Sequence, residues 1–272
     1  MLKESNLIVD RYSAEGRFDR LPEIVRGAVA ARPDVIEFAG APDTVKLLQS
    51  EARTIPIVAW TADPISAGIV SNLARPGGNV TGLSTVAGPE IGTKRVQLFV
   101  EAVGQLSKVG WLGTRAVWDD PTGMPLKRTA EKMNIPLHPE PLQAPVNEAE
   151  YRRAFDAMRR DHVDGVMISN ESENYAHRVL LGRLALQYRL PAICWYPDTV
   201  EAGALMSYGF DTKAGSRRVA AQVAEILNGG NPAEMPFFQE THFSLVINLK
   251  VAKELGLEIP VGFVARADRV IE

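Results

Sequence analysis

The chain has 272 residues, which is long enough to bury a sizeable core in one large domain or in two smaller ones. Hydrophobic residues make up 46% of it, charged residues make up 23%, and the net charge is −3, which is an ordinary globular composition. The basic residues are balanced locally by acidic ones, so the sequence excludes the electrostatic footprint of a nucleic-acid binder. No apolar run approaches the roughly 20 residues that a membrane-spanning helix needs.

The first third of the chain alternates short β-rich runs with longer amphipathic runs. Leu21, Val25 and Val29 recur with helical spacing, which predicts a helix over 19–31. A Pro-Gly-Gly-Asn turn at 76–79 precedes the last strand of this part. We expect strands at 7–9, 34–39, 55–60 and 80–83, and helices at 19–31, 44–52 and 65–73.

The same alternation starts afresh and continues to the end of the chain. Pro139 and Pro141 interrupt one β-rich run, and because proline cannot donate to a strand ladder, we expect this strand at the edge of a sheet. Residues 118–121 are expected to form a loop. We expect strands at 109–112, 137–142, 165–169, 192–195, 204–208 and 244–247, and helices at 89–103, 126–133, 148–160, 175–188, 214–227 and 249–255.

Alternation of strands and helices predicts an α/β fold with parallel sheets that are covered by helices on both faces. The repeating units are too numerous for one small sheet, so we expect two doubly wound lobes with a cleft between them. The chain is expected to cross between the lobes near Leu83 and again near Met206. Lobe 1 would then comprise residues 1–83 and 206–240, and lobe 2 residues 84–205 and 241–272.

Motifs of catalytic chemistry are absent. The sequence has no G-x-G-x-x-G fingerprint and no G-x-S-x-G elbow, and the segment from Gly88 to Lys94 is one residue short of a P-loop. The four histidines are scattered without metal-ligand spacing, and Cys194 lies in an apolar run that favours a buried, inert thiol. We therefore expect a binding protein rather than an enzyme, with no catalytic residue, no metal and no cofactor.

In open parallel sheets, ligands bind beyond the carboxyl ends of the strands, where loops meet helix N-termini. The loops at these positions combine aromatic side chains, suited to stacking, with acidic and hydroxyl groups, suited to polar anchoring. For stacking and aromatic surface we select Trp118, Trp195, Tyr196 and Tyr208. For polar contacts we select Pro42, Asp43, Thr44, Asp63, Ser84, Asp119, Glu171 and Asp211.

Each of these residues also has a purely structural interpretation. Asp43, Asp63 and Glu171 stand where a helix N-cap would lie. The neighbouring carboxylates Asp119 and Asp120 suit a cap or a turn as well as acid–base work. The gathering of aromatic residues at strand ends is better evidence for a site than any single member.

Several segments carry a family resemblance that extends over essentially the whole chain. The run Ser13 to Pro22 resembles the A-E-G-R-x-D-R-L-P signature of the bacterial ABC transporter substrate-binding family that includes TrpX-like proteins. Asn72 to Ser84, with its Arg-Pro-Gly-Gly-Asn-Val-Thr-Gly core, is the most specific block. Residues 202–209, 245–253 and 265–272 also resemble the family.

The resemblance implies a type I periplasmic-binding fold in which two lobes hold a small solute, and it implies an ABC permease in the membrane as partner. It also implies a periplasmic or membrane-anchored extracytoplasmic location, although Met1 to Asp10 has no signal-peptide pattern. Relatives carry a first strand and helix before the segment that matches Asn6 onward, so we expect lobe 1 to lack them. The solute is expected to be an amino acid, an aromatic compound or a sugar-like molecule. A cytoplasmic ligand-sensing module and an α/β enzyme of unknown class remain the alternatives.

Overall fold

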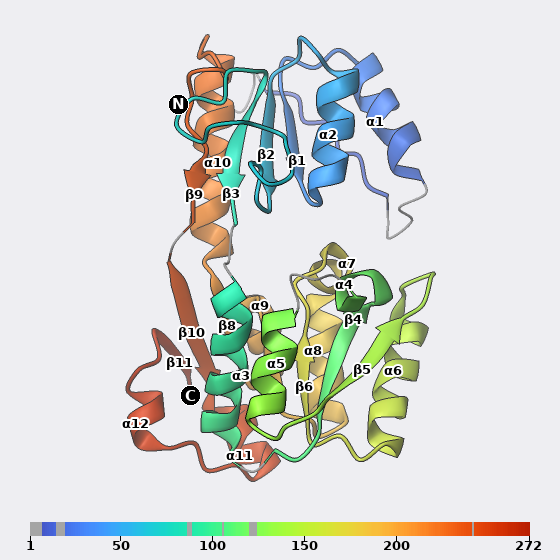
Figure 1. Cartoon of the computed structure of the whole chain (residues 1–272), viewed down its shortest axis with the longest axis vertical. Coiled ribbons are helices and arrows are strands. Elements are labelled where there is room, and N and C mark those ends of the chain that lie inside the picture. Colours follow the sequence, from blue (N-terminus) through green and yellow to red (C-terminus); the bar gives the residue numbers. More distant parts are fainter. Residues whose placement is uncertain (1–6, 15–19, 86–88, 105, 120–123, 241) are drawn as a thin grey trace. The chain divides into compact units, whose positions relative to one another are not determined.

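The computed structural model describes residues 7–14, 20–85, 89–104, 106–119, 124–240 and 242–272. The chain divides into two compact units (Figure 1). Unit 1 comprises Met1–Val86 and Thr212–Thr241, and unit 2 comprises Ala87–Asp211 and His242–Glu272. Each unit is an α/β structure with its own sheet and its own hydrophobic core.

Unit 1 is built on a parallel sheet whose strands follow the order β1-β2-β3-β9. Both faces of this sheet are covered, because successive side chains of a strand point to opposite sides. Ile57 packs into one cluster with helices α1 and α2, whereas its neighbour Val58 packs into another with α10. The elements are α1 (Leu21–Ala30), β1 (Ile36–Ala39), α2 (Pro42–Glu51), β2 (Ile57–Thr61), β3 (Val80–Ser84), α10 (Thr212–Leu227) and β9 (Phe238–Gln239).

Unit 2 is built on a larger sheet with the strand order β11-β10-β8-β7-β6-β4-β5. Its pairings from β8 to β5 are parallel, while β10 runs antiparallel to β8. The strands are β4 (Val109–Thr114), β5 (Leu137–Leu142), β6 (Gly165–Ile168), β7 (Ala192–Cys194), β8 (Met206–Phe210), β10 (Phe243–Asn248) and β11 (Arg269–Ile271). The helices are α3 (Pro89–Val103), α4 (Arg115–Asp119), α5 (Met124–Lys132), α6 (Glu148–Arg160), α7 (Ser172–Ala176), α8 (Arg178–Gln187), α9 (Pro197–Glu201), α11 (Leu249–Leu255) and α12 (Val261–Val264).

The two faces of this second sheet are also buried. Trp111 packs with Phe99 of α3 on one face, and its neighbour Leu112 packs with Phe155 of α6 on the other. Both faces of the strands are therefore apolar, which is typical of parallel strands covered by helices on both sides.

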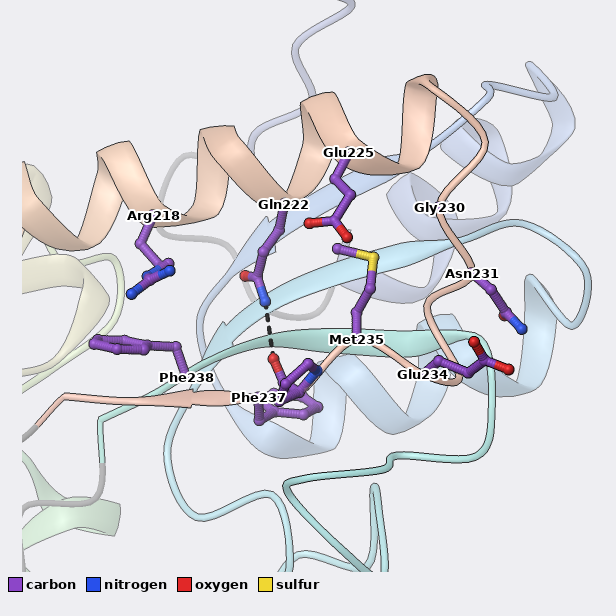
Figure 2. Close-up of a pocket in the computed structure, with 10 residues that line it drawn as sticks. Arg218, Gln222, Glu225, Gly230, Asn231, Glu234, Met235, Phe237 and Phe238 are labelled. Atoms are coloured by element: carbon purple, nitrogen blue, oxygen red, sulfur yellow. Dashed lines mark hydrogen bonds between the residues drawn. The ribbon is translucent and has the colours of Figure 1, made fainter.

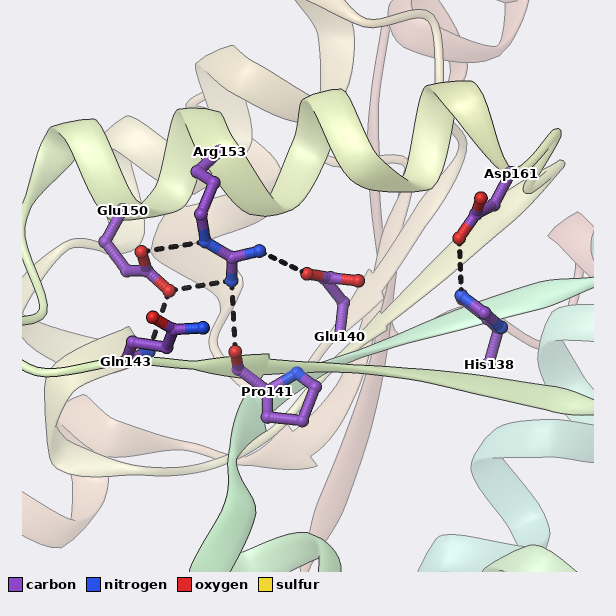
Figure 3. Close-up of polar contacts among 7 residues, drawn as sticks. All are labelled: His138, Glu140, Pro141, Gln143, Glu150, Arg153 and Asp161. Atoms are coloured by element: carbon purple, nitrogen blue, oxygen red, sulfur yellow. Dashed lines mark hydrogen bonds and ion pairs between the residues drawn. The ribbon is translucent and has the colours of Figure 1, made fainter.

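Strand β5 lies at the edge of this sheet, as its prolines predict, and Arg153 of α6 binds one of its backbone carbonyl groups (Figure 3). Arg153 of α6 donates to the carbonyl oxygen of Pro141 at 3.1 Å and pairs with Glu140 at 2.5 Å. It also pairs with Glu150 of its own helix at 2.8 Å, and these two carboxylates raise the pKa of the guanidinium. Farther along the strand, His138 contacts Asp161 at 2.7 Å. These contacts tie the edge strand to α6 and to the residue that follows this helix.

Three local predictions are wrong. Residues 7–9 form no strand, and Ile8 is 89% exposed. Residues 65–73 form turns rather than a helix, because Gly68 has a left-handed φ of 72° that interrupts helical geometry. Trp118 lies in helix α4 instead of a loop. Asp120 and Pro121 of that expected loop, like residues 15–19 of the family signature, lie outside the described residues.

Two further boundaries differ from the prediction. The helix expected over 175–188 is two helices, α7 and α8, which meet at His177. The second crossing between units follows Asp211 rather than Met206, because β8 pairs with β7 and β10 and so belongs to the sheet of unit 2. The expected strand at 204–208 therefore ends in unit 2, and α10 is the element that returns to unit 1.

Candidate functional site

The carboxyl ends of four neighbouring strands meet along one edge of the unit 2 sheet. Strands β4, β6, β7 and β8 run parallel, so the residues that follow or end them lie at the same edge, where α/β proteins bind ligands. We call the side chains gathered here the strand-end cluster. It comprises Arg95, Thr114, Ser169, Glu171, Tyr175, Trp195, Tyr196 and Phe210.

Glu171 joins β4 and β6 at this edge. Its two carboxylate oxygens accept hydrogen bonds from the backbone N–H of Thr114 at 3.1 and 2.9 Å. The hydroxyls of Thr114 and Ser169 also donate to it. The capacity of this carboxylate to accept hydrogen bonds is therefore largely used within the protein. Glu171 positions its neighbours, and it does not present a free anion to a ligand amine.

Aromatic side chains stand at the carboxyl ends of β7 and β8, and we call Trp195, Tyr196 and Phe210 the aromatic wall. The ring of Trp195, which is 8% exposed, lies 6.3 Å from that of Phe210. Tyr196 packs edge-on against Phe210 at 6.2 Å and against Tyr175 at 4.6 Å. The Tyr196 hydroxyl donates to the carbonyl oxygen of Asn170 at 3.0 Å, and burial raises its pKa. This phenol stays neutral and fixed, so it offers a ring edge rather than a charge.

Arg95 is the functional candidate that sequence reasoning missed. It is 4% exposed, and its Nη2 donates to the carbonyl oxygens of Ile168 at 3.0 Å and Ile193 at 3.3 Å, at the ends of β6 and β7. Its guanidinium carbon lies 4.7 Å from the ring centre of Trp195. The Nε–H of Arg95 has no hydrogen-bond partner among the described residues.

The charge of Arg95 is also unbalanced. Within the described part of the chain, no carboxylate forms an ion pair with it, and burial lowers its pKa to about 10. A buried cation without an anion is costly, so its presence at a strand end points to a ligand rather than to stability. One signal could have revealed it. Arg95 stands in the apolar stripe of α3 between Ile91 and Leu98, where a hydrophobic residue is expected.

A second buried carboxylate lies beside the cluster. Glu173 of α7 is 6% exposed, and burial together with the nearby Glu171 raises its pKa to about 6. The neighbouring Asn174 accepts a hydrogen bond from the Tyr151 hydroxyl at 2.9 Å and donates to Ser169 Oγ at 2.9 Å. The short helix α7 is thus held by buried polar contacts that continue to the strand-end cluster.

The other candidates of unit 2 occupy different surroundings. Trp118 packs against the core at 5.1 Å from Trp111, with the Lys127 ammonium 4.1 Å from its ring. Tyr208 also packs against the core, 6.0 Å from Phe243. Asp119 pairs with Arg115 of its own helix at 2.8 Å and is 55% exposed, and Asp211 is exposed after β8. The structure therefore places Trp118, Tyr208 and Asp119 outside the strand-end cluster, whereas Asp211 directly follows Phe210 at the same edge of the sheet.

The candidates of unit 1 lie at the carboxyl ends of its own strands. Pro42 and Asp43 begin α2 after β1, and Asp43 pairs with Lys46 at 2.8 Å while Thr44 is buried. Asp63 follows β2 and accepts hydrogen bonds from the backbone N–H of Ser66 at 3.0 Å and of Ile65 at 3.2 Å. The hydrogen bonds from Ser66 lower its pKa. Asp63 thus acts as a turn cap.

Ser84 ends β3 of unit 1 and differs from the other candidates there. It is fully buried, and its Oγ has no hydrogen-bond partner among the described residues. A buried hydroxyl without a partner costs free energy unless a ligand or water supplies one.

Within the described residues, no group of three or more His, Cys, Asp or Glu side chains is placed to hold a metal ion. None of the described helices is both long enough and apolar enough to span a bilayer. Cys194 is buried in β7, and burial raises the pKa of its thiol to about 12, which makes it a poor nucleophile.

Comparison with known proteins agrees with this geometry. The chain matches the family model described as ABC transporter substrate binding protein over residues 2–271. It is 21% identical over 255 residues to the tyrosine-binding protein of Clostridioides difficile (strain R20291), covering 93% of this chain and 72% of that protein.

Two solved structures share the fold. A conserved domain protein from Vibrio cholerae has a TM-score of 0.81 and 29% identity, covering 98% of this chain and 88% of that chain. An ABC domain from Streptococcus pneumonia in complex with L-Trp has a TM-score of 0.81 and 23% identity, covering 99% and 89%. Because the family model matches nearly every residue, the chain belongs to the family of ABC transporter substrate binding proteins.

Proposed function

We propose that this substrate-binding protein captures a small organic solute that carries a carboxylate and an aromatic body, and that it delivers the solute to an ABC permease for import. The observation that carries the proposal is Arg95, a buried cation with one unused N–H and no carboxylate partner among the described residues. A solute carboxylate would supply the missing anion and accept the unused hydrogen bond.

The aromatic wall supports the aromatic body of the proposed solute. Trp195 and Tyr196 follow β7, whose residue Ile193 accepts a hydrogen bond from Arg95, and Phe210 ends the neighbouring strand β8. Aromatic rings recognise flat apolar bodies, and such pairs contribute about 0.5–1.5 kcal/mol beyond the area that they bury. A carboxylate and a ring together describe an aromatic amino acid or a related aromatic acid. Relatives named for tyrosine binding and solved with L-Trp agree with this class.

Unit 1 is proposed to contribute polar contacts to the same solute. Ser84, with its unpartnered buried hydroxyl, is the first candidate, and the start of α2 from Pro42 to Thr44 is the second. That the two units share one solute is a prediction, which variants of each unit test separately. We also propose that the protein acts in the extracytoplasmic space, where substrate-binding proteins of this family act.

The proposal is tested by isothermal titration of the intact chain with L-tyrosine, L-tryptophan, their decarboxylated analogues tyramine and tryptamine, and a panel of sugars. We expect at least one amino acid to bind and to raise the melting temperature by mass action. The matching amine, which keeps the ring but lacks the carboxylate, should bind at least tenfold more weakly. Equal binding of amine and amino acid, or preferential binding of a sugar, would contradict the proposed solute class. Catalytic turnover of any of them would favour the enzyme alternative instead.

A further inference from the structure

Tyr175 extends the aromatic wall to the surface of unit 2. It belongs to α7, and its ring meets the ring of Tyr196 edge-on at 4.6 Å. Tyr196 in turn contacts Phe210, and Phe210 contacts Trp195, so the four rings form one connected row at the carboxyl edge of the sheet. Arg95 lies beside Trp195, at the end of the row that is remote from Tyr175.

The four rings of this row differ in the surface that they offer to a ligand. Trp195 is 8% exposed and Phe210 is 7% exposed, because the protein encloses both of them. Tyr196 is partly buried, whereas Tyr175 is 38% exposed. Stacking requires an accessible ring face, so Tyr175 is the member of the row that is best placed to receive the ring of a solute. The inner rings support it.

The ring of Tyr175 is also held in place. The guanidinium carbon of Arg178 lies 4.5 Å from its ring centre, and Arg178 Nη1 donates to the carbonyl oxygen of Tyr175 at 3.0 Å. Arg178 is itself anchored, because its Nε pairs with Asp198 of α9 at 3.1 Å. A ring that is fixed before the solute arrives loses little conformational freedom when the solute binds.

Tyr196 lies close both to Tyr175 and to the charged end of the row. Burial raises the pKa of the Tyr196 phenol, and the next contributions come from Tyr175, which raises it, and from Arg95, which lowers it. Because such electrostatic effects weaken with distance, the phenol is near both residues. A small solute whose carboxylate pairs with Arg95 can therefore direct its aromatic body toward Tyr175.

The hollow in unit 1 between α10 and the segment that leads into β9 offers no comparable ring (Figure 2). Phe237 lines this hollow but is 4% exposed. Phe238 also lines it, and the guanidinium carbon of Arg218 lies 4.1 Å from its ring centre. The rings of this hollow are therefore buried or covered by an arginine, and Tyr175 is the better place for an aromatic body.

We propose that Tyr175 determines the specificity of the solute site, and that the aromatic ring of the solute stacks on its exposed ring. This inference rests on the proposed function, because it requires a solute with an aromatic body, and it adds the residue that selects that body. In the competing structural interpretation, Tyr175 only covers Tyr196. That interpretation predicts no contact between Tyr175 and the solute.

The first test is an NMR titration of the intact chain with L-tryptophan or L-tyrosine, whichever binds more tightly. The ring signals of Tyr175 are assigned by their loss in Tyr175→Phe. Stacking brings the ring of the solute against that of Tyr175, so its ring current should shift these signals on saturation. Tyr12 is the internal control, because it is a tyrosine of unit 1 that is 49% exposed, and its signals should not move.

The second test is isothermal titration of Tyr175→Ala with the same amino acid. Loss of the ring removes both the stacking and the apolar contact, so the affinity should fall by about tenfold or more. Tyr175→Phe is the matched control, since it keeps the ring and removes a hydroxyl that forms no hydrogen bond with any described residue. Its Kd should stay close to that of wild type, and so should that of Tyr12→Ala.

Unshifted Tyr175 signals in the saturated protein, or a wild-type Kd in Tyr175→Ala, would overturn the inference. If the amino acid binds more tightly than its decarboxylated analogue while Tyr175 does not respond, this inference fails and the proposed function stands. If neither amino acid binds, the proposed function fails and the role of Tyr175 fails with it. If a thermal melt shows that Tyr175→Ala does not fold, the NMR titration of the wild-type protein decides.

Discussion

Replacement of Arg95 by methionine separates a ligand-binding role from a structural one. Methionine replaces the aliphatic part of the arginine side chain but carries no charge. Burial lowers the pKa of Arg95 to about 10, and since each pKa unit is worth about 1.4 kcal/mol, keeping this guanidinium charged costs the folded state about 3 kcal/mol. The variant removes that cost. It also removes the hydrogen bonds to the carbonyl oxygens of Ile168 and Ile193, at about 1–3 kcal/mol for each acceptor left unsatisfied.

These two effects oppose each other. We therefore expect the unfolding free energy of Arg95→Met, measured by urea titration, to differ from wild type by no more than about 3 kcal/mol. The affinity for the amino acid should behave differently. Loss of the only charged partner of a buried carboxylate costs about 2–5 kcal/mol, which corresponds to a factor of roughly 30 to several thousand in Kd.

The assay is isothermal titration of wild type, Arg95→Met and Arg95→Lys, with Arg152→Met as the control. Arg152 is an exposed arginine that pairs with Glu148 of its own helix, and its loss should change neither Kd nor stability appreciably. The lysine variant should recover part of the affinity, since it restores the charge without the fork geometry. If Arg95→Met keeps the wild-type Kd but loses more than about 4 kcal/mol of unfolding free energy, Arg95 is structural and the reasoning is refuted.

Three further predictions follow from the same structure. Glu171→Ala leaves the Thr114 N–H without its acceptor and should lower the unfolding free energy, measured by urea titration, by about 2–4 kcal/mol. An unchanged unfolding free energy would show that this contact does not stabilise the fold. Burial raises the pKa of Glu173 from 4.5 to about 6, so the folded state keeps this proton to a higher pH than the unfolded state. The unfolding free energy should therefore fall as the pH rises from 4.5 through 6, and Glu173→Gln should flatten this part of the plot of stability against pH. An unaltered plot in the variant would contradict the assignment. Gly82→Ala would place a Cβ 1.9 Å from the carbonyl oxygen of Ala59, at a residue whose φ is +150°. The variant should lose about 3 kcal/mol or more of unfolding free energy, which a thermal melt would show as a sharply lower melting temperature. A fully stable variant would be inconsistent with this pairing of β2 with β3.

Periodicity was sufficient to predict the long elements of the fold. The helices expected over 89–103 and 148–160 are confirmed with those same boundaries, because each carries an apolar stripe over three or more turns. The segment 65–73 has apolar residues at suitable spacing, but Gly68 adopts a positive φ, and the sequence pattern does not reveal that conformation. Strand β9, with two residues, is too short for any periodic signal.

The site was harder to predict than the fold. The rule that ligands bind at strand ends selected Glu171, Trp195 and Tyr196, which the structure brings together in the strand-end cluster. The same rule selected Trp118, which instead packs against the core beside Trp111, because side-chain direction depends on tertiary packing. Arg95 lies on a helix remote in sequence from the strand ends that it contacts, so no local motif could place it there.

The most direct test of the central claim is the Nε–H signal of Arg95 in the arginine side-chain NMR spectrum, assigned by comparison with Arg95→Lys. Nε–H has no partner among the described residues in the free protein. If Arg95 binds the solute carboxylate, saturation with the tightest amino acid of the panel should shift this signal strongly and slow its exchange with water. A saturated protein whose Arg95 signal is unchanged would contradict the account.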